Sequence, residues 1–409
     1  MRILVVNHEY VYPPAGGHKL AVFTSLRSLA RRGHEITHLS WGAGRSTDIY
    51  VDEIRFLHQG IETFDPMSVP SWLKAVGSNF FLSQVWRLRD KGLPLKSAMK
   101  LLNNETFDII IHESPDGSPL PYTLSRLFAI PLVERVHWVS VPRSISNIDQ
   151  WEDYVGVRLI SHNKLLSLGR LLAKQIVDKV ERGAPSLRKA NLILTVSKKD
   201  EELMKAWGFS NVQLSLLPYE PMKTAEKNAD LEFRKPPYAV FSGPLNQRTN
   251  LFSAFFIAKL AREMRKVTFL IAGGDATFFK SFALPQNFVP LGFISPRSHA
   301  YMLSVASIVL IPQVLGHGLQ TKLAEALAYG KPVITTSVVA EEFPELINGR
   351  RLIIEDDPGK WANIITYMLD DEEYLRKISR EARDYYMRNL SPDVHAVTLE
   401  RVLRELRRE

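Results

Sequence analysis

The segment 316–336, GHGLQTKLAEALAYGKPVITT, contains the residues of the chain best suited to bind a ligand. At 100° per residue, a helix over 319–329 places Gly318, Lys322 and Glu325 on one stripe. The amino end of a helix attracts anions through its unpaired N–H groups and its dipole, and Lys322 adds a positive charge there. Glu325 stands about 10 Å farther along the axis than Gly318, at 1.5 Å per residue. This spacing allows one ligand to place a phosphate at the helix start and its ribose at the carboxylate.

A purely structural role would account for the same helix. Lysine and glutamate three residues apart often form an exposed pair on a helix surface. Here glycines precede the helix and apolar strand-like runs flank it, which favours a cleft. We therefore expect Leu323, Ala326 and Leu327 to face the core and the Lys322 stripe to face a ligand.

The composition is that of a globular chain with two domains. Its 409 residues are 45% hydrophobic and 23% charged, and single cores stop growing at about 300 residues. No apolar run approaches the roughly 20 residues of a membrane-spanning helix. The apolar run at 1–6 is too short for the core of a secretory signal, and the absence of cysteine excludes a disulfide framework. A cytoplasmic location is therefore expected. The net charge of +8 favours an anionic partner, either a nucleotide, a phospholipid surface or a nucleic acid.

Short β-branched runs alternate with amphipathic stretches in both halves of the chain, which is typical of βαβ units around parallel sheets. The strand candidates are 2–7, 35–41, 53–57, 108–112, 131–137, 191–197, 212–218, 238–243, 267–273, 288–292, 307–313, 332–336 and 351–355. Between the two sets, 219–237 is polar and contains three prolines. We predict a Rossmann-like domain at 1–218, a linker at 219–237 and a second Rossmann-like domain at 238–390. A last helix at about 391–409 could pack back on the first domain.

Open parallel sheets bind ligands beyond the carboxyl ends of their strands. The residues expected at these ends in the first half are Gly16, Gly17, His112, Glu113 and His137. Those expected in the second half are Gly243, Gly273, Gly274, Gly292, Phe293, Gly316, His317 and Gly318. Glycine admits close approach of a ligand, although any one of these glycines could instead only permit a tight turn.

The pattern Gly-x-Gly-x-x-x-Lys-x-x-Glu-Ala-x-Ala-x-Gly-x-Pro-Val at 316–333 resembles the donor-nucleotide segment of glycosyltransferase family 4, within the GT-B superfamily. Weaker similarities follow in the same order: PAGG at 14–17, ARRGHE at 30–35, VERVH at 133–137 and ANLILTVS at 190–197. The resemblance implies an α/β GT-B fold, with two facing Rossmann-like domains and a deep interdomain cleft. It also implies a hexosyl-type glycosyltransferase that moves a sugar from a nucleotide-diphosphate sugar to an acceptor hydroxyl.

The same resemblance implies roles for single residues. In the family, the second domain binds the donor, the later Glu of a Glu-x7-Glu motif holds the ribose, and a histidine of the first domain contacts the reacting centre. Glu325 and His137 match these two positions, so His137 is the predicted catalytic residue. The predicted donor-binding residues are Gly16, Gly17, Gly243, Arg248, Gly292, Phe293, Ile294, His317, Gly318, Leu319, Lys322 and Glu325, of which 292–294 shape the base pocket. The predicted acceptor-binding residues are His112 and Glu113.

Two positions depart from the family pattern. His317 stands where the family often has the Glu that touches the donor sugar, so the motif does not fix the sugar. The cations of the family's Gly-Arg-x5-Lys stretch are missing after Gly243. Arg248 or Lys322 is expected to supply the charge that the diphosphate needs.

Sugar transfer requires stabilisation of the leaving diphosphate and exclusion of water. The family is commonly metal-independent, and the sequence has no Asp-x-Asp. We therefore expect no metal and no cofactor besides the nucleotide-sugar substrate. The family analogy implies retention of the anomeric configuration, whereas an inverting enzyme would use His137 or Glu113 as general base.

Apolar residues accompanied by lysines and arginines at 63–102 and 155–182 suit a basic surface that binds anionic lipid. A lipid-linked or cell-surface glycan acceptor, polysaccharide biosynthesis and a peripheral position at the inner face of the membrane would fit this surface. The solvated face of ordinary core helices would produce the same pattern.

Two other classes of protein stay open. A GT-B relative acting as a nucleotide-sugar epimerase or a phosphorylase could use His112, Glu113, His137 and His317 as acid–base groups. A nucleic-acid-binding α/β protein is disfavoured, because the basic residues are spread along the chain and no nucleic-acid motif is present.

Overall fold

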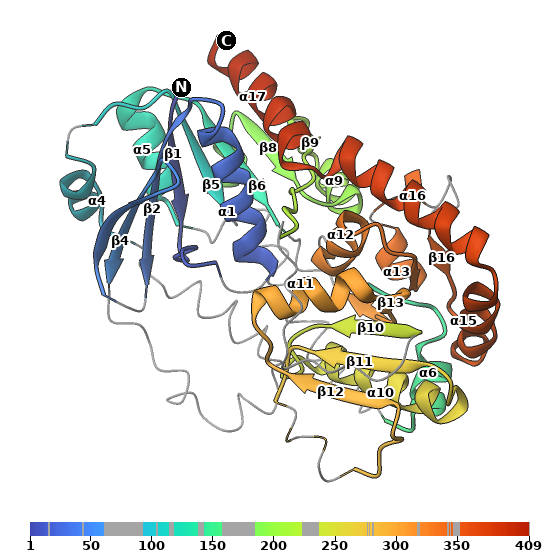
Figure 1. Cartoon of the computed structure of the whole chain (residues 1–409). Helices are drawn as coiled ribbons and strands as arrows, with labels where there is room; N and C mark the ends of the chain where they lie inside the picture. Colours follow the sequence, from blue (N-terminus) through green and yellow to red (C-terminus); the bar gives the residue numbers. More distant parts are fainter. Residues whose placement is uncertain are drawn as a thin grey trace, which may run out of the picture. The chain divides into compact units, whose positions relative to one another are not determined.

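Apolar β-branched runs form two main sheets in the computed structural model, and each sheet belongs to a separate compact unit (Figure 1). The first unit comprises Met1–Val141, Ser161–Pro218 and Pro392–Glu409, and the second comprises Pro142–Ile160 and Tyr219–Ser391. The structure describes residues 1–14, 17–42, 45–60, 93–103, 105–113, 118–137, 143–157, 185–222, 237–275, 277, 279, 282–316, 320–341, 343, 345–346 and 352–408. The predicted basic stretches at 63–102 and 155–182 therefore lie mostly outside the described residues.

We expected 1–218 to form one domain, but the segment Pro142–Ile160 groups with the second unit. Its helix α6 (Ile148–Val155) buries Trp151, whose ring centre lies 4.5 Å from that of Phe256 and 5.7 Å from that of Trp361. The indole Nε1–H donates to Asp356 O at 2.7 Å. An aromatic side chain with its polar atom satisfied is a strong anchor, which explains the grouping.

The first unit has an eight-stranded sheet in the order β3-β4-β2-β1-β5-β6-β8-β9. Its strands are β1 (Arg2–Asn7), β2 (Glu35–Gly42), β3 (Thr47–Val51), β4 (Ile54–Gly60), β5 (Ile109–Glu113), β6 (Leu132–Val136), β8 (Leu192–Thr195) and β9 (Val212–Leu214). All neighbours are parallel except β3, which pairs antiparallel with β4. The edge strand β3 is missing from the predicted strands, because its mixed sequence, TDIYV, is only partly buried.

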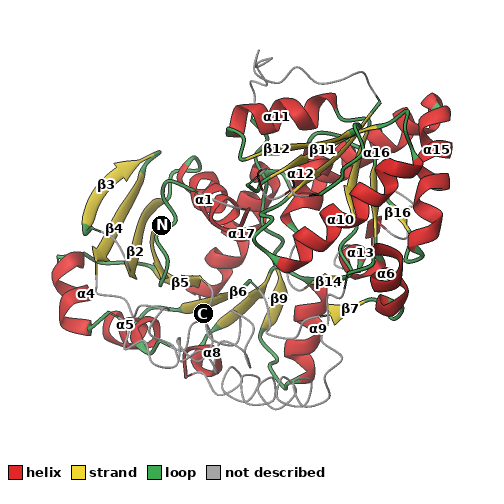
Figure 2. Cartoon of the chain, turned by 90° about the horizontal axis from the view of Figure 1, so that it is seen from below, coloured by secondary structure: helices red, strands yellow, loops and turns green. Residues whose placement is uncertain are grey.

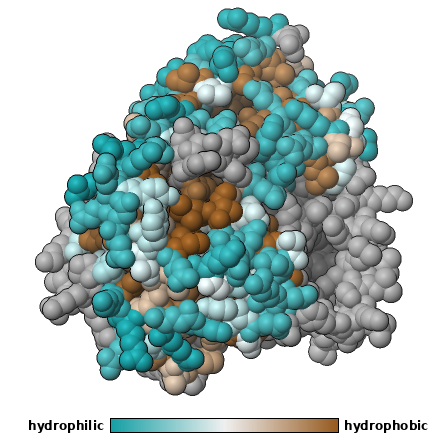
Figure 3. All heavy atoms as spheres, turned by 90° about the vertical axis from the view of Figure 1, so that its right-hand side faces the viewer, coloured by the Kyte–Doolittle hydropathy of each residue, from teal (hydrophilic) through white to brown (hydrophobic). Residues whose placement is uncertain are grey.

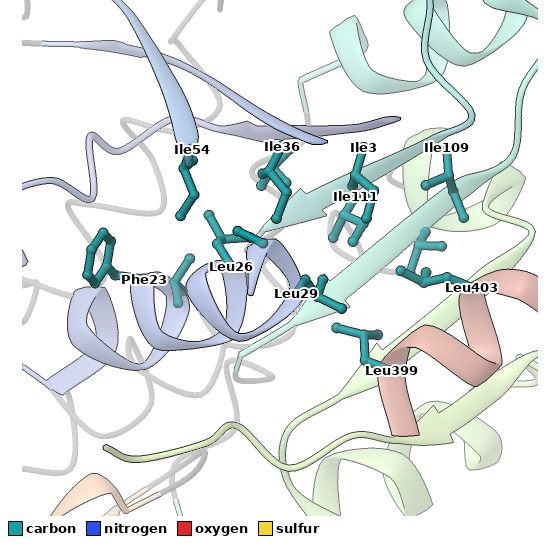
Figure 4. Close-up of a cluster of buried hydrophobic side chains, with 14 of the residues drawn as sticks. Ile3, Phe23, Leu26, Leu29, Ile36, Ile54, Ile109, Ile111, Leu399 and Leu403 are labelled. Atoms are coloured by element: carbon teal, nitrogen blue, oxygen red, sulfur yellow. The ribbon is translucent and has the colours of Figure 1, made fainter. Parts of the chain in front are cut away.

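Helices cover both faces of this sheet. They are α1 (Gly17–Ala30), α4 (Leu95–Leu102), α5 (Leu120–Phe128), α8 (Pro185–Lys189), α9 (Lys198–Ala206) and α17 (Pro392–Arg408). Ile3 and Val5 of β1 pack with side chains of α1 and α17, whereas Leu4 and Val6 pack with those of α4 and α5. Figure 4 shows the first of these layers, in which Leu399 and Leu403 of α17 meet Leu29 of α1. The carboxyl-terminal helix thus completes the core of the first unit.

The second unit has a parallel six-stranded sheet in the order β12-β11-β10-β13-β15-β16 (Figure 2). Its strands are β10 (Tyr238–Ser242), β11 (Thr268–Ala272), β12 (Phe288–Gly292), β13 (Ile308–Ile311), β15 (Val333–Thr335) and β16 (Ile353–Ile354). A short antiparallel pair joins β14 (Leu315–Gly316) to β7 (Arg143–Ser144). Strand order reverses between β10 and β13, and such a switch point is where α/β sheets bind ligands.

The helices of the second unit, besides α6, are α10 (Arg248–Glu263), α11 (Pro296–Val305), α12 (Thr321–Ala328), α13 (Ser337–Ala340), α15 (Trp361–Asp370) and α16 (Glu372–Asn389), with a 3-10 turn at η3 (Pro358–Lys360). Helix α12 ends as its sequence indicates. Gly330 has a φ of 61°, and the N–H groups of Gly330 and Lys331 donate to the carbonyls of Leu327 and Ala326. This is the hydrogen-bond pattern of a Schellman cap, which glycine favours.

Among the coloured residues in Figure 3, hydrophilic side chains predominate, and hydrophobic side chains gather in a patch near the middle of the view. Among the described helices, none has the length and apolar character needed to cross a bilayer.

Candidate active site

In the second unit, three segments meet at the carboxyl end of β10. A Cβ atom on Gly243, directly after β10, would stand 2.8 Å from Lys322 Cε and 3.0 Å from Asn250 Cγ. Lys322 Nζ donates to Asn250 Oδ1 at 2.8 Å and lies 5.7 Å from the centre of the Phe241 ring. A side chain at 243 would therefore displace the lysine of α12 from its present path to the first turn of α10.

Two helix starts contribute to this place. Neither Gln247 before α10 nor Gln320 before α12 caps its helix with a side-chain hydrogen bond. Asn250 Nδ2 donates to Pro244 O at 3.1 Å and to Gln247 Oε1 at 2.9 Å, which fixes the amide that receives Lys322. The amino ends of both helices carry partial positive charge, so the site favours an anion.

Lys322 is the better placed of the two predicted cations. Arg248 is the exposed first residue of α10, whereas Lys322 is partly buried against Gly243 and Asn250. We expected Thr249 at the place of the lysine in the family's Gly-Arg-x5-Lys stretch, but counting from Gly243 places that lysine at residue 250. Lys322 thus brings an ammonium group to the asparagine that stands at this position.

Burial lowers the pKa of Lys322 to about 8, and Glu325 partly opposes the shift. Near neutral pH the group is mainly charged, and its remaining donors suit phosphate oxygens.

Glu325 lies one turn after Lys322, and its side chain is 14% exposed. Tyr219 Oη donates to Glu325 Oε1 at 2.6 Å, and His299 Nδ1 lies 3.3 Å from the same oxygen. Neither partner was among the predicted site residues, since Tyr219 begins the segment Tyr219–Ser391 and His299 belongs to α11. Helix α12 buries Leu323, Ala326 and Leu327, as predicted, and also Ala324 and Ala328.

Some glycines at strand ends serve the packing of the loops themselves. Gly273 has a φ of 105°, and a Cβ there would stand 2.5 Å from Gly243 O. A Cβ on Gly274 would stand 2.4 Å from the side chain of Leu245. After β12, Gly292 has a φ of 71° and Phe293 is 80% exposed, whereas Ile294 is partly buried.

In the first unit, His137 and Glu113 come together as a buried pair. Glu113 ends β5, His137 follows β6, and His137 Nε2 donates to Glu113 Oε2 at 2.7 Å. Burial opposes ionisation of Glu113, but Arg135 and His137 outweigh it and lower the pKa of Glu113 to about 2. The predicted catalytic histidine is thus held by an ionised carboxylate.

A chain of hydrogen bonds extends from Glu113 to the carboxyl-terminal helix. Arg135 Nη1 donates to Glu113 Oε1 at 2.8 Å and to Ser25 Oγ at 3.0 Å. His395 Nδ1 donates to Leu216 O at 2.9 Å, so its Nε2 accepts from Ser25 Oγ at 2.8 Å. The sequence signal for this network is a pair of charged residues, Glu134 and Arg135, inside an otherwise apolar strand.

His18 was also missed. It follows the predicted Gly16-Gly17 loop in α1, and its ring centre lies 4.4 Å from that of His137, edge to face. Burial, and next the charge of His137, lower the pKa of His18 to about 3, so it is neutral near pH 7.

His112 lies on the other face of β5 from Glu113. It is fully buried, and its Nδ1 donates to Glu134 Oε2 at 2.8 Å. The parallel register of β5 and β6 sets His112 beside Glu134 and Glu113 beside Arg135, which explains both pairs. Because side chains alternate along a strand, the structure does not bring the two predicted acceptor-binding residues together.

The remaining predicted residues divide in two groups. Gly17 is the exposed first residue of α1. Gly16, His317, Gly318 and Leu319 lie outside the described residues. Within the described part of the chain, no group of histidine and carboxylate side chains is arranged to hold a metal ion.

Solved structures of known proteins share this architecture. Sucrose-phosphate synthase from Thermosynechococcus elongatus superposes with a TM-score of 0.71, at 15% identity over 99% of this chain and 98% of that chain. HepE of Anabaena, in complex with UDP, gives 0.63 at 14% identity over 99% and 100%. The calicheamicin glycosyltransferase CalG4 gives 0.52 at 18% identity over 98% of each chain. A search of curated proteins gave no match.

Two Rossmann-like units with these neighbours define the GT-B fold, so the predicted α/β GT-B fold with two Rossmann-like domains is confirmed. Residues 236–371 match the family model described as Glycosyl transferases group 1. This part of the second unit is thus similar to group 1 glycosyltransferases, and the predicted resemblance to glycosyltransferases of the GT-B type is confirmed.

Proposed function

We propose that the protein is a hexosyl-type glycosyltransferase that moves a sugar from a nucleoside-diphosphate sugar to an acceptor hydroxyl. The convergence of Lys322, Asn250 and Gly243 at the switch point of the second sheet carries this proposal. These residues form a positively charged site within 236–371, the part of the chain that matches the group 1 glycosyltransferase model. A diphosphate is the anion that such a domain has to bind.

In this proposal the donor lies along α12. The diphosphate binds Lys322 and the amino ends of α10 and α12, the ribose binds Glu325, and the base lies at 292–294 with Phe293 as a stacking surface. The proposal keeps His317, Gly318 and Leu319, which lie outside the described residues, as predicted donor-binding residues. HepE, one of the similar structures, was solved with UDP, with UDP and glucose, and with UDP-glucose, which makes UDP the first nucleotide to test.

The chemistry requires no metal in this proposal. Lys322 and the helix dipoles stabilise the charge that develops on the leaving diphosphate. The leaving phosphate takes the acceptor proton, and the configuration is retained. His137, oriented by Glu113, contacts the donor sugar near the reacting carbon, and Glu113 lies on the acceptor side.

The acceptor class rests on the sequence. The basic apolar stretches at 63–102 and 155–182 support a lipid-linked or cell-surface glycan as acceptor, in polysaccharide biosynthesis at the inner face of a membrane. Lack of co-sedimentation with anionic vesicles would remove this part of the proposal.

A thermal-shift screen against UDP, GDP, ADP and their sugars tests the donor. Binding to the native state raises the melting temperature by mass action, and Lys322→Met is expected to abolish the shift. Incubation of the best nucleotide-sugar without acceptor then separates transfer from isomerisation, because only an epimerase would convert the sugar. No shift with any nucleotide would overturn the proposed function.

A further inference from the structure

The two carboxylate oxygens of Glu325 have unequal surroundings. Oε1 accepts the hydroxyl of Tyr219 at 2.6 Å and lies 3.3 Å from Nδ1 of His299. Among the described residues, no hydrogen bond or ion pair reaches Oε2. A carboxylate oxygen has two acceptor sites, so Oε2 can still receive two hydroxyl groups.

Tyr219 is itself firmly held. It is the first residue of the segment Tyr219–Ser391 of the second unit, its N–H donates to Leu390 O at 3.1 Å, and its carbonyl accepts from Tyr386 Oη at 2.8 Å. Burial and the neighbouring Glu325 raise the pKa of its phenol, so it stays a donor over the whole working range of pH. Its position therefore does not depend on Glu325 alone.

His299 comes from a different element. It is the fourth residue of α11, whose start is fixed by Pro296 and by Ser295 Oγ, which accepts the Ser298 N–H at 3.1 Å. Two independently anchored side chains thus meet at one oxygen of Glu325. An exposed glutamate that makes only a helix-surface pair would not have such partners.

We infer that Tyr219 and His299 are positioning residues that fix Oε1 of Glu325 and leave Oε2 to accept the ribose hydroxyls of the donor. The inference rests on the proposed function, because it assigns the recognition of ribose to that site. It also predicts a specificity. A nucleotide that lacks the ribose hydroxyls cannot bind Oε2 of Glu325, so its affinity should not depend on Tyr219 and His299.

Calorimetric titration with UDP and with 2′,3′-dideoxy-UDP tests the inference. If GDP or ADP binds more tightly than UDP, that nucleotide and its 2′,3′-dideoxy analogue are used instead. Tyr219→Phe is expected to weaken binding of the ribonucleotide about tenfold, the effect of one hydrogen bond to a charged group. Binding of the dideoxy analogue should not change. His299→Ala should act in the same direction, and His299→Asn, which keeps a donor, should restore part of the loss.

Tyr154→Phe is the matched control, since Tyr154 Oη also donates to a glutamate of the same unit, Glu263 Oε1, at 2.7 Å. It should leave both affinities unchanged. If Tyr219→Phe weakens binding of both nucleotides equally, or of neither, the inference is overturned while the proposed function stands. A wild-type protein that binds none of the nucleoside diphosphates would overturn the proposed function itself.

Discussion

At the scale of single residues, the placement of Lys322 determines the character of the donor site. Lys322 belongs to α12, and its ammonium group lies beyond the end of β10. There it donates to Asn250, a neutral residue of α10. Burial makes this lysine easier to deprotonate than an exposed one, so its charge depends on pH in an accessible range.

The first prediction concerns that pH dependence. With a pKa of about 8, Lys322 is charged below pH 8 and neutral above it, so affinity for a nucleoside diphosphate should fall as pH rises through 8 to 10. Lys322→Arg should remove the fall, because guanidinium stays charged. Calorimetric titrations between pH 7 and 10 would measure both profiles. The same alkaline loss in the arginine variant would assign the dependence to another group.

The sequence indicated some of these residues and could not indicate others. Lys322 and Glu325 were predicted together because helical spacing alone puts them on one stripe. Tyr219 is 106 residues from Glu325, and a contact at that separation is fixed only when the sheet and its helices have packed. Asn250 was missed because a neutral side chain at a position for a cation gives no sign of its partner.

At the scale of elements, α17 ties the end of the chain to the core of the first unit. Leu399 and Leu403 are buried with Leu29, and His395 joins Ser25 of α1 to Leu216 O. Two buried leucines contribute roughly 3–6 kcal/mol. The bonds of His395 also connect this helix to Arg135 and, through it, to the pair of Glu113 and His137.

A second prediction follows for His395→Ala. It removes both ring hydrogen bonds and leaves a cavity, so the free energy of unfolding should fall by about 2–4 kcal/mol, seen as a lower urea midpoint. Val397→Ala, at a side chain of the same helix that is 51% exposed, should change it by less than about 0.5 kcal/mol. Equal effects of the two substitutions would show that His395 does not anchor the helix.

Strands were predicted more successfully than connections. The candidate 2–7 coincides with β1, because a short β-branched apolar run is typical of a parallel strand buried on both faces. The division of the chain was harder to predict, since α6 packs on residues more than 100 positions away. The alternation of strands and helices, which is a local property, predicted two Rossmann-like domains, and the resemblance of 316–333 to a known family implied the GT-B class.

At the scale of the whole molecule, buried neutral histidines make stability depend on pH. Burial, as the largest cause in each case, lowers the pKa of His18 to about 3, of His38 to about 4 and of His395 to about 3. All three lie in the first unit. In the unfolded chain a histidine has a pKa of about 6.5, so below that pH the unfolded state binds protons that the folded state does not.

The third prediction is therefore a loss of stability on the acid side. The free energy of unfolding should rise with pH between about 4 and 6.5 and level off near pH 7, when urea unfolding is followed at steps of half a pH unit. His38 packs against the ring of Phe56, so leucine can take its place without titrating. His38→Leu should reduce the slope by up to about 1.4 kcal/mol per pH unit in this window. An unchanged slope in this variant would mean that His38 binds its proton in the same pH range in the folded and the unfolded chain, and that the acid sensitivity comes from other groups.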